Sequence, residues 1–255
     1  HCICEKPLAA DPADIERMIA ARDGSGRILM TAQHMRFEQR TRSIRKLIDA
    51  GDVGDVYYSR AWWLRRRMAP TTPGFLSRAQ GVHGPGLDIG VHVLDLALHL
   101  MDFPKPVSVT GISVQKLARQ PDVGNSWGSY EPEAYEVEDF AGGFIRFENG
   151  GALSLEVSWL LNMPEAETFS VALHGTRGGV RWPECLFNQV RAGVHVNSQL
   201  VSDTGGDGHK NELAAFVETI RSGGRSPVPA EQSLIVARVL AGLYESAEAG
   251  REVRL

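Results

Sequence analysis

The segment GLDIGVHVLDLALHLM, residues 86–101, is apolar on almost every side and predicts a buried helix from Leu87 to Met101. Its polar residues are spaced by four, three and four positions, which places them along one narrow stripe of that helix. A carboxylate buried beside an imidazole is costly unless the two groups are paired or line a cavity. The stripe consists of Asp88, His92, Asp95 and His99.

Three interpretations of this stripe remain open from the residues alone. The first is a structural pair that orders the interior. The second is a divalent metal held by Asp88 and His92 one helical turn apart, with His83 as the possible third ligand. The third is acid–base catalysis, because a histidine with an ordinary pKa near 6.5 takes a proton from an alcohol at neutral pH. We predict no metal site, since no convincing third ligand is present.

The segment that precedes the helix reads as strand, helix, strand over residues 1–32. Asp11 is a plausible N-cap with Pro12 at the first helical position, and a glycine-rich turn at residues 24–26 ends the helix. A short apolar run at residues 27–32 predicts a buried strand. This order is one unit of a parallel α/β sheet, and one unit alone is not a domain.

The chain beyond residue 35 predicts a different architecture. A helix at residues 43–50 and an aromatic strand at residues 56–63 are followed by a loop rich in proline. Further strands and two closing helices come after the apolar helix, with loops at 115–136 and 197–209. We therefore predict an α/β chain in which a piece of a parallel sheet precedes an α+β domain with a large, mostly antiparallel open sheet. The predicted later elements are strands at 107–114, 138–147, 152–159, 167–173 and 253–255, and helices at 211–220 and 233–249.

Composition narrows the class of partner. The 255 residues include 27 basic and 31 acidic side chains, a net charge of −4 that gives no reason to expect nucleic acid or an anionic membrane surface. No apolar run approaches the roughly 20 residues of a membrane span. The odd number of cysteines, Cys2, Cys4 and Cys185, argues against a disulfide framework and favours a reducing cytoplasm.

Several motifs, taken in order, resemble the Gfo/Idh/MocA oxidoreductases, which include glucose–fructose oxidoreductase and inositol dehydrogenase. They are CEKPLA at residues 4–9, QHMRF at 33–37 and GPGLDIGVHVLD at 84–95, followed by VEDFAGGFIRFENG at 137–150 and YESAEAGREVRL at 244–255. Each motif is modest alone, and their common order makes the joint signal strong.

The resemblance implies a catalytic group of three residues. The lysine of the family's E-K-P turn matches Lys6, and its D-x-G-x-H motif matches Asp88 and His92. His92 would accept the proton, Lys6 would polarise the reacting hydroxyl, and Asp88 would orient the substrate or His92. The hydride would pass to or from NAD or NADP.

The resemblance also implies a cofactor face formed by Glu5, Lys6, Pro7 and His34. His34 departs from the family, since many members have asparagine at that position of an N-R-R-F motif. No G-x-G-x-x-G fingerprint follows a strand in this chain. We therefore expect residues 1–35 to be the C-terminal remnant of a Rossmann domain and residues 36–255 to be a substrate and oligomerisation domain, which forms a homo-oligomer through its sheet.

The expected substrate is a sugar, a polyol or a related secondary alcohol. Trp63 and Arg65 are candidate substrate-binding residues, because aromatic faces stack on sugar rings and an arginine binds a carboxylate or phosphate. The alternative is a truncated homologue without redox chemistry that binds a sugar-like ligand or a partner subunit.

Overall fold

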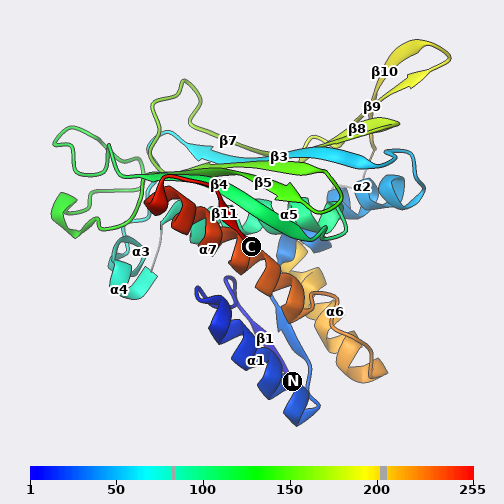
Figure 1. The fold of residues 1–255 in the computed structure, drawn as a ribbon, viewed down its shortest axis with the longest axis horizontal. Helices are drawn as coiled ribbons and strands as arrows, with labels where there is room; N and C mark the ends of the chain where they lie inside the picture. Colours follow the sequence, from blue (N-terminus) through cyan, green and yellow to red (C-terminus); the bar gives the residue numbers. More distant parts are fainter. Residues whose placement is uncertain (82–83, 202–205) are drawn as a thin grey trace.

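The computed structural model describes residues 1–81, 84–201 and 206–255, which form two separate sheets (Figure 1). The smaller sheet pairs β1 (Cys2–Cys4) with β2 (Leu29–Thr31) in parallel, and α1 (Pro12–Ser25) connects them. The side chain of Asp11 accepts a hydrogen bond from the backbone N–H of Ala13 at 2.9 Å, and Gly26 ends the helix in the left-handed conformation. The predicted strand–helix–strand unit is confirmed.

The larger sheet has nine strands in the order β10-β9-β8-β7-β3-β6-β5-β4-β11. All neighbours are antiparallel except β3 and β6, which run parallel. The predicted fold class, a small parallel sheet followed by a large and mostly antiparallel one, is therefore confirmed. The strands are β3 (Val56–Arg65), β4 (Pro106–Val114), β5 (Phe140–Phe147), β6 (Ala152–Ser158), β7 (Glu167–Gly175), β8 (Gly178–Trp182), β9 (Leu186–Arg191), β10 (Val194–Gln199) and β11 (Val253–Arg254).

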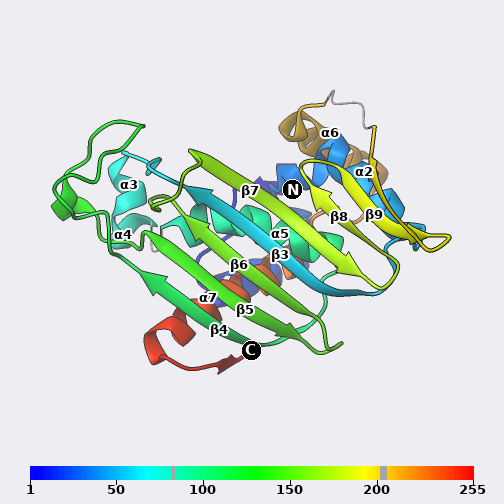
Figure 2. The same cartoon turned by 90° about the horizontal axis from the view of Figure 1, so that it is seen from above.

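Helices cover one face of the large sheet and leave the other bare (Figures 1 and 2). The apolar helix α5 (Val91–Leu100) packs on β3 and β7, and its leucines lie in the main core with the inward residues of the strands. The long helix α7 (Ala230–Ala249) packs on β4 and, through its other side, on α1 and β2. It therefore lies between the two sheets and joins them. Two further helices, α2 (Gln39–Asp49) and α6 (Gly208–Ser222), lie beside this centre.

Several elements differ from the prediction. Three strands, β8 to β10, occupy residues 178–199, where no strand was expected and a loop was predicted from 197. The outer pair forms a hairpin whose residues are largely exposed, so its sequence lacks the buried alternation that identifies a strand. Its turn at Ala192 and Gly193 has positive φ at both residues, which is typical of a tight hairpin. Two short helices, α3 (Pro73–Leu76) and α4 (Arg78–Gly81), lie in the predicted proline-rich loop.

The apolar helix is not α-helical from Leu87 as predicted. Residues Gly86–Gly90 form a π-helical turn, and the α-helix starts at Val91. The wider turn carries Asp88, and such turns are frequent at functional sites. A methyl group on Gly86 would lie 1.9 Å from the hydroxyl oxygen of Tyr244, so any larger residue there would require the Tyr244 side chain to move. None of the described helices is both long and apolar enough to cross a membrane.

A buried ion pair fixes α5 to the strand unit. Arg36, in the 3-10 turn η1 (His34–Phe37), donates from Nε to Asp95 Oδ2 at 2.7 Å and from Nη2 to Oδ1 at 2.5 Å. Its Nη1 donates to Gln232 of α7 at 2.5 Å. The side chains of Arg36 and Asp95 are 3% and 1% exposed, so each charge depends on the other for compensation. Asp95 of the polar stripe is therefore paired with an arginine, a partner that the stripe itself did not predict.

Replacing Asp95 by alanine should lower the free energy of unfolding by about 3–5 kcal/mol, because Arg36 would remain buried without its partner. Urea denaturation followed by circular dichroism measures this change. The matched control is Asp14→Ala, which removes an exposed ion pair to Arg17 and should have little effect. Equal, small losses in both variants would contradict the role given to the buried pair.

Candidate active site

The turn after β1 brings Lys6 to the π-helical turn. The ammonium of Lys6 donates to the carbonyl oxygen of Asp88 at 2.7 Å and to its carboxylate Oδ1 at 3.1 Å. Both side chains are less than one-fifth exposed, 17% and 18% respectively. The contact joins residues 82 positions apart in the sequence, one from each sheet unit.

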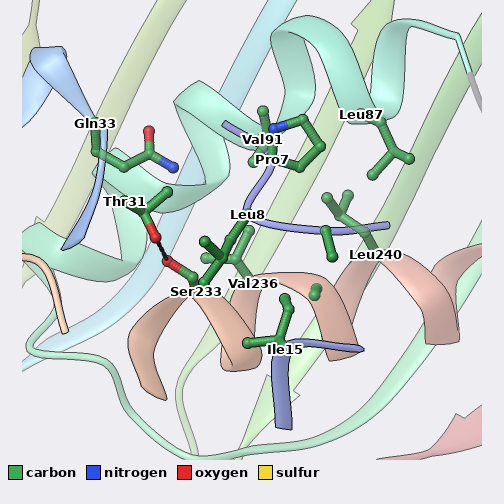
Figure 3. Close-up of a pocket in the computed structure, with 12 residues that line it drawn as sticks. Pro7, Leu8, Ile15, Thr31, Gln33, Leu87, Val91, Ser233, Val236 and Leu240 are labelled. Atoms are coloured by element: carbon green, nitrogen blue, oxygen red, sulfur yellow. Dashed lines mark hydrogen bonds between the residues drawn. The ribbon is translucent and has the colours of Figure 1, made fainter. Parts of the chain in front are cut away.

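The residues beside Lys6 hold it in place through packing. Pro7 and Leu8 line a small apolar cavity together with Leu87 and Val91, which flank Asp88 (Figure 3). On the far side of this cavity, Thr31 of β2 and Ser233 of α7 share a hydrogen bond of 2.8 Å. The Lys6 turn is thus fixed by both apolar contacts and the α7 connection.

Asp88 is held by a second donor. Its other carboxylate oxygen, Oδ2, accepts from the indole Nε1 of Trp159 at 3.2 Å, and Trp159 is fully buried. Both carboxylate oxygens are therefore directed to Lys6 and Trp159. The resemblance left open whether Asp88 orients the substrate or His92, and that role stays a prediction. Trp159 was not expected in the site, and nothing in its sequence context marks it.

His92 lies one turn further along α5 and faces the same cavity as Asp88. Within the described part of the chain, its Nδ1 is buried without a hydrogen-bond partner. Burial lowers the pKa of His92 well below its usual value, and the positive charge of Lys6 lowers it further. The imidazole is consequently neutral at physiological pH and can accept a proton.

Two further histidines extend this group. His34 contacts His92 edge to face, with ring centroids 5.2 Å apart, and stacks on His209 of α6 at 4.0 Å. Burial lowers the pKa of His34 to about 4, and the neighbouring His209 and Lys6 act in the same direction, while Glu5 and Asp207 oppose them. His209 was missed from the sequence because it falls within a predicted loop.

The cavity beside His92 has a volume of about 500 Å³. Trp63 and Arg65, the two predicted substrate-binding residues, both line it. Glu167 Oε1 accepts from Trp63 Nε1 and from Arg65 Nε, each at 2.7 Å. Trp127 also lines it and was missed, since it lies in a long predicted loop. The other lining residues are Pro70, Thr71, Thr72, Phe75 and Ile89.

Two predictions remain to be placed in the structure: the cofactor-binding residue Glu5 and the possible metal site. Glu5 follows β1 and is exposed, and its carboxylate accepts from the backbone N–H of Lys6 at 3.3 Å. Among residues 1–81, 84–201 and 206–255, no group of three or more metal-ligating side chains comes together. His83, considered above as a third metal ligand, lies outside the described residues.

Comparison with known proteins assigns the family. A family model described as the GFO/IDH/MocA C-terminal domain matches residues 41–181. D-glucoside 3-dehydrogenase of Escherichia coli strain K12 is 32% identical over the whole of this chain, which spans 72% of that relative. The scyllo-inositol 2-dehydrogenase (NADP(+)) of Bacillus subtilis is 24% identical, with coverage of 100% and 72%. The chain belongs to the GFO/IDH/MocA family of oxidoreductases.

Solved structures show the same fold. The aldose-aldose oxidoreductase of Caulobacter crescentus superposes with a TM-score of 0.80 at 24% identity, over 100% of this chain and 72% of that one. Levoglucosan dehydrogenase in complex with NADH and L-sorbose superposes with a TM-score of 0.83 at 21% identity, over 100% and 73%. Both sheets of this chain therefore have counterparts in these two solved structures.

The lowered histidine pKa values predict a loss of stability in mild acid. In the unfolded chain His34 becomes protonated as the pH falls below about 6.5, whereas in the folded protein its pKa is about 4. The free energy of unfolding should therefore decrease as the pH is lowered from about 6.5 to about 4. His34→Gln should make this decrease with pH less steep. Urea denaturation across this range measures it, with exposed His195→Gln as the matched control. An unchanged slope in the His34 variant would contradict the assignment.

Proposed function

We propose that this protein is an NAD(P)-dependent oxidoreductase that moves a hydride between a nicotinamide and a secondary alcohol of a sugar or polyol. The observation that carries the proposal is the contact of Lys6 with Asp88, one turn before a neutral His92, at a cavity of about 500 Å³. The names of the relatives support it, since they include dehydrogenases of a glucoside and of an inositol.

The three residues have separate tasks. A neutral His92 takes the hydroxyl proton as the alcohol is oxidised, and returns it in the reverse reaction. The positive charge of Lys6 stabilises the negative charge that develops on the same oxygen. Asp88 anchors the Lys6 ammonium through two bonds, and Trp159 in turn fixes Asp88. This arrangement sets the position of the lysine before the substrate binds.

The residues fit a nicotinamide ring on the β1 side of the site. The nicotinamide, when bound, accepts or supplies the hydride. Glu5, Lys6 and Pro7 form the turn against which we place it, with His34 at the neighbouring edge. Among the described residues, His92 Nδ1 is buried without a hydrogen-bond partner, which supports an additional ligand here. Such atoms are costly unless a partner is supplied.

We further propose that residues 1–35 belong to a dinucleotide-binding domain, residues 36–255 form the substrate domain, and the protein is a cytoplasmic homo-oligomer. The separation into two sheets supports the division. The bare face of the large sheet carries the exposed apolar side chains Ile112 and Phe144, which supports association through that face. The three cysteines are free thiols, in accord with a reducing compartment.

Replacing Lys6 by methionine or His92 by asparagine should lower turnover about 10²- to 10⁴-fold, because each removes one catalytic charge or proton acceptor. The measurement is the rate of NAD or NADP reduction with glucosides and inositols as substrates. Lys105→Met, at an exposed ion pair with Glu148, is the matched control and should keep the wild-type rate. Circular dichroism establishes that the variants fold. Wild-type rates in both site variants would overturn the proposed function.

A further inference from the structure

A row of side chains leads away from His92 along one wall of the cavity. The ring of Trp63 lies 6.2 Å from that of His92, the guanidinium of Arg65 lies 5.2 Å from Trp63, and the ring of Trp127 lies 4.6 Å from Arg65. All four line the same cavity. Trp127 is therefore separated from the proton acceptor by two intervening side chains, which places it at the other end of the row.

The middle of this row is a paired and stacked arginine. Glu167 accepts from both Trp63 and Arg65, and it pairs with the Arg65 guanidinium at 2.7 Å. Arg65 is only 8% exposed, and its guanidinium is stacked against both tryptophans. The pair with Glu167 offsets the charge of Arg65. The two tryptophans on either side of it give this wall aromatic faces that favour a ligand with a ring.

Trp127 is exposed, yet its loop is firmly anchored. The side chain of Asn125 both accepts from and donates to the backbone of Ala69, each at 2.9 Å, and Ser126 N–H donates to the Arg67 carbonyl at 2.8 Å. These bonds fix the loop to the segment that continues from β3. The indole itself is 49% exposed. An exposed aromatic face on a fixed backbone is preorganised to bind a ring at small entropic cost.

We propose that the substrate is a glycoside, whose sugar ring reacts beside His92 while the ring of its aglycone or second sugar stacks on Trp127. This inference rests on the proposed function, which it narrows from sugars and polyols in general to sugars that carry a second ring. A cavity of about 500 Å³ lies well within the roughly 300–1,000 Å³ typical of ligand pockets, so it has room for more than a single small ring. Trp127 is thus a specificity-determining residue.

The test compares methyl β-glucoside with phenyl β-glucoside, which differ by one ring. For each, KM and kcat are measured with NAD and NADP, and the dissociation constant is measured by calorimetry. In Trp127→Ala, KM and the dissociation constant for phenyl glucoside should rise about 3- to 10-fold, the value expected for one lost aromatic contact. The change for methyl glucoside, which lacks the second ring, should be clearly smaller. Trp127→Phe, which keeps a stacking face, should retain most of the preference.

One control variant and the pattern of outcomes distinguish a failure of this inference from a failure of the proposed function. Tyr57→Ala removes an exposed aromatic side chain of β3 that does not line this cavity, and it should leave both glucosides unaffected. Equal affinity of the wild-type protein for the two glucosides, or an equal change for both in Trp127→Ala, overturns the inference. A wild-type protein that binds phenyl glucoside more tightly through Trp127 but reduces neither cofactor would overturn the proposed function and leave only the ring-binding role of Trp127 standing.

Discussion

The buried contact of Arg36 with Asp95 and Gln232 is the interaction on which the arrangement of the site depends. It joins the segment that follows β2 to α5 and to α7, the helix that lies between the two sheets. Lys6 and Asp88 come from opposite sides of this junction, and their hydrogen bonds require that the two units keep a fixed distance. The buried pair of Arg36 and Asp95 maintains that distance, because moving the two side chains apart would leave each charge buried without its partner and without water.

The polar stripe of the apolar helix divides between structure and chemistry. Asp95 and His99 lie toward the C-terminal end. There Asp95 pairs with Arg36, and burial, helped by the nearby arginines, lowers the pKa of His99 to about 3. Asp88 and His92 lie toward the N-terminal end and face the cavity. The π-helical turn at Gly86–Gly90 changes the direction of Asp88, so that its carboxylate meets Lys6 and Trp159. A regular α-helix from Leu87 would present Asp88 differently.

Much of the fold follows from local patterns, and much of the site does not. The strand–helix–strand unit, the apolar helix and the central strands carry strong periodicity or capping signals, and the structure contains them. The β9–β10 hairpin buries little apolar surface and so carries no such signal. Motif matching found Lys6, Asp88 and His92, and the structure brings them to one place. Trp127, Trp159 and His209 reach the site through long-range contacts from a loop, a strand end and a distant helix, which no local pattern encodes.

The same burial that keeps His92 neutral also costs stability in acid. A neutral imidazole at physiological pH is obtained here by desolvation and by the nearby positive charge of Lys6. Lys6 thus acts on His92 at a distance while Asp88 holds it in place. Because Asp88 bonds the lysine and not the histidine, its carboxylate tunes the site chiefly by positioning a cation. Burial and the charge of Lys6 together lower the pKa of His92, so the contact that fixes Lys6 on Asp88 also bears on the protonation of the neighbouring imidazole.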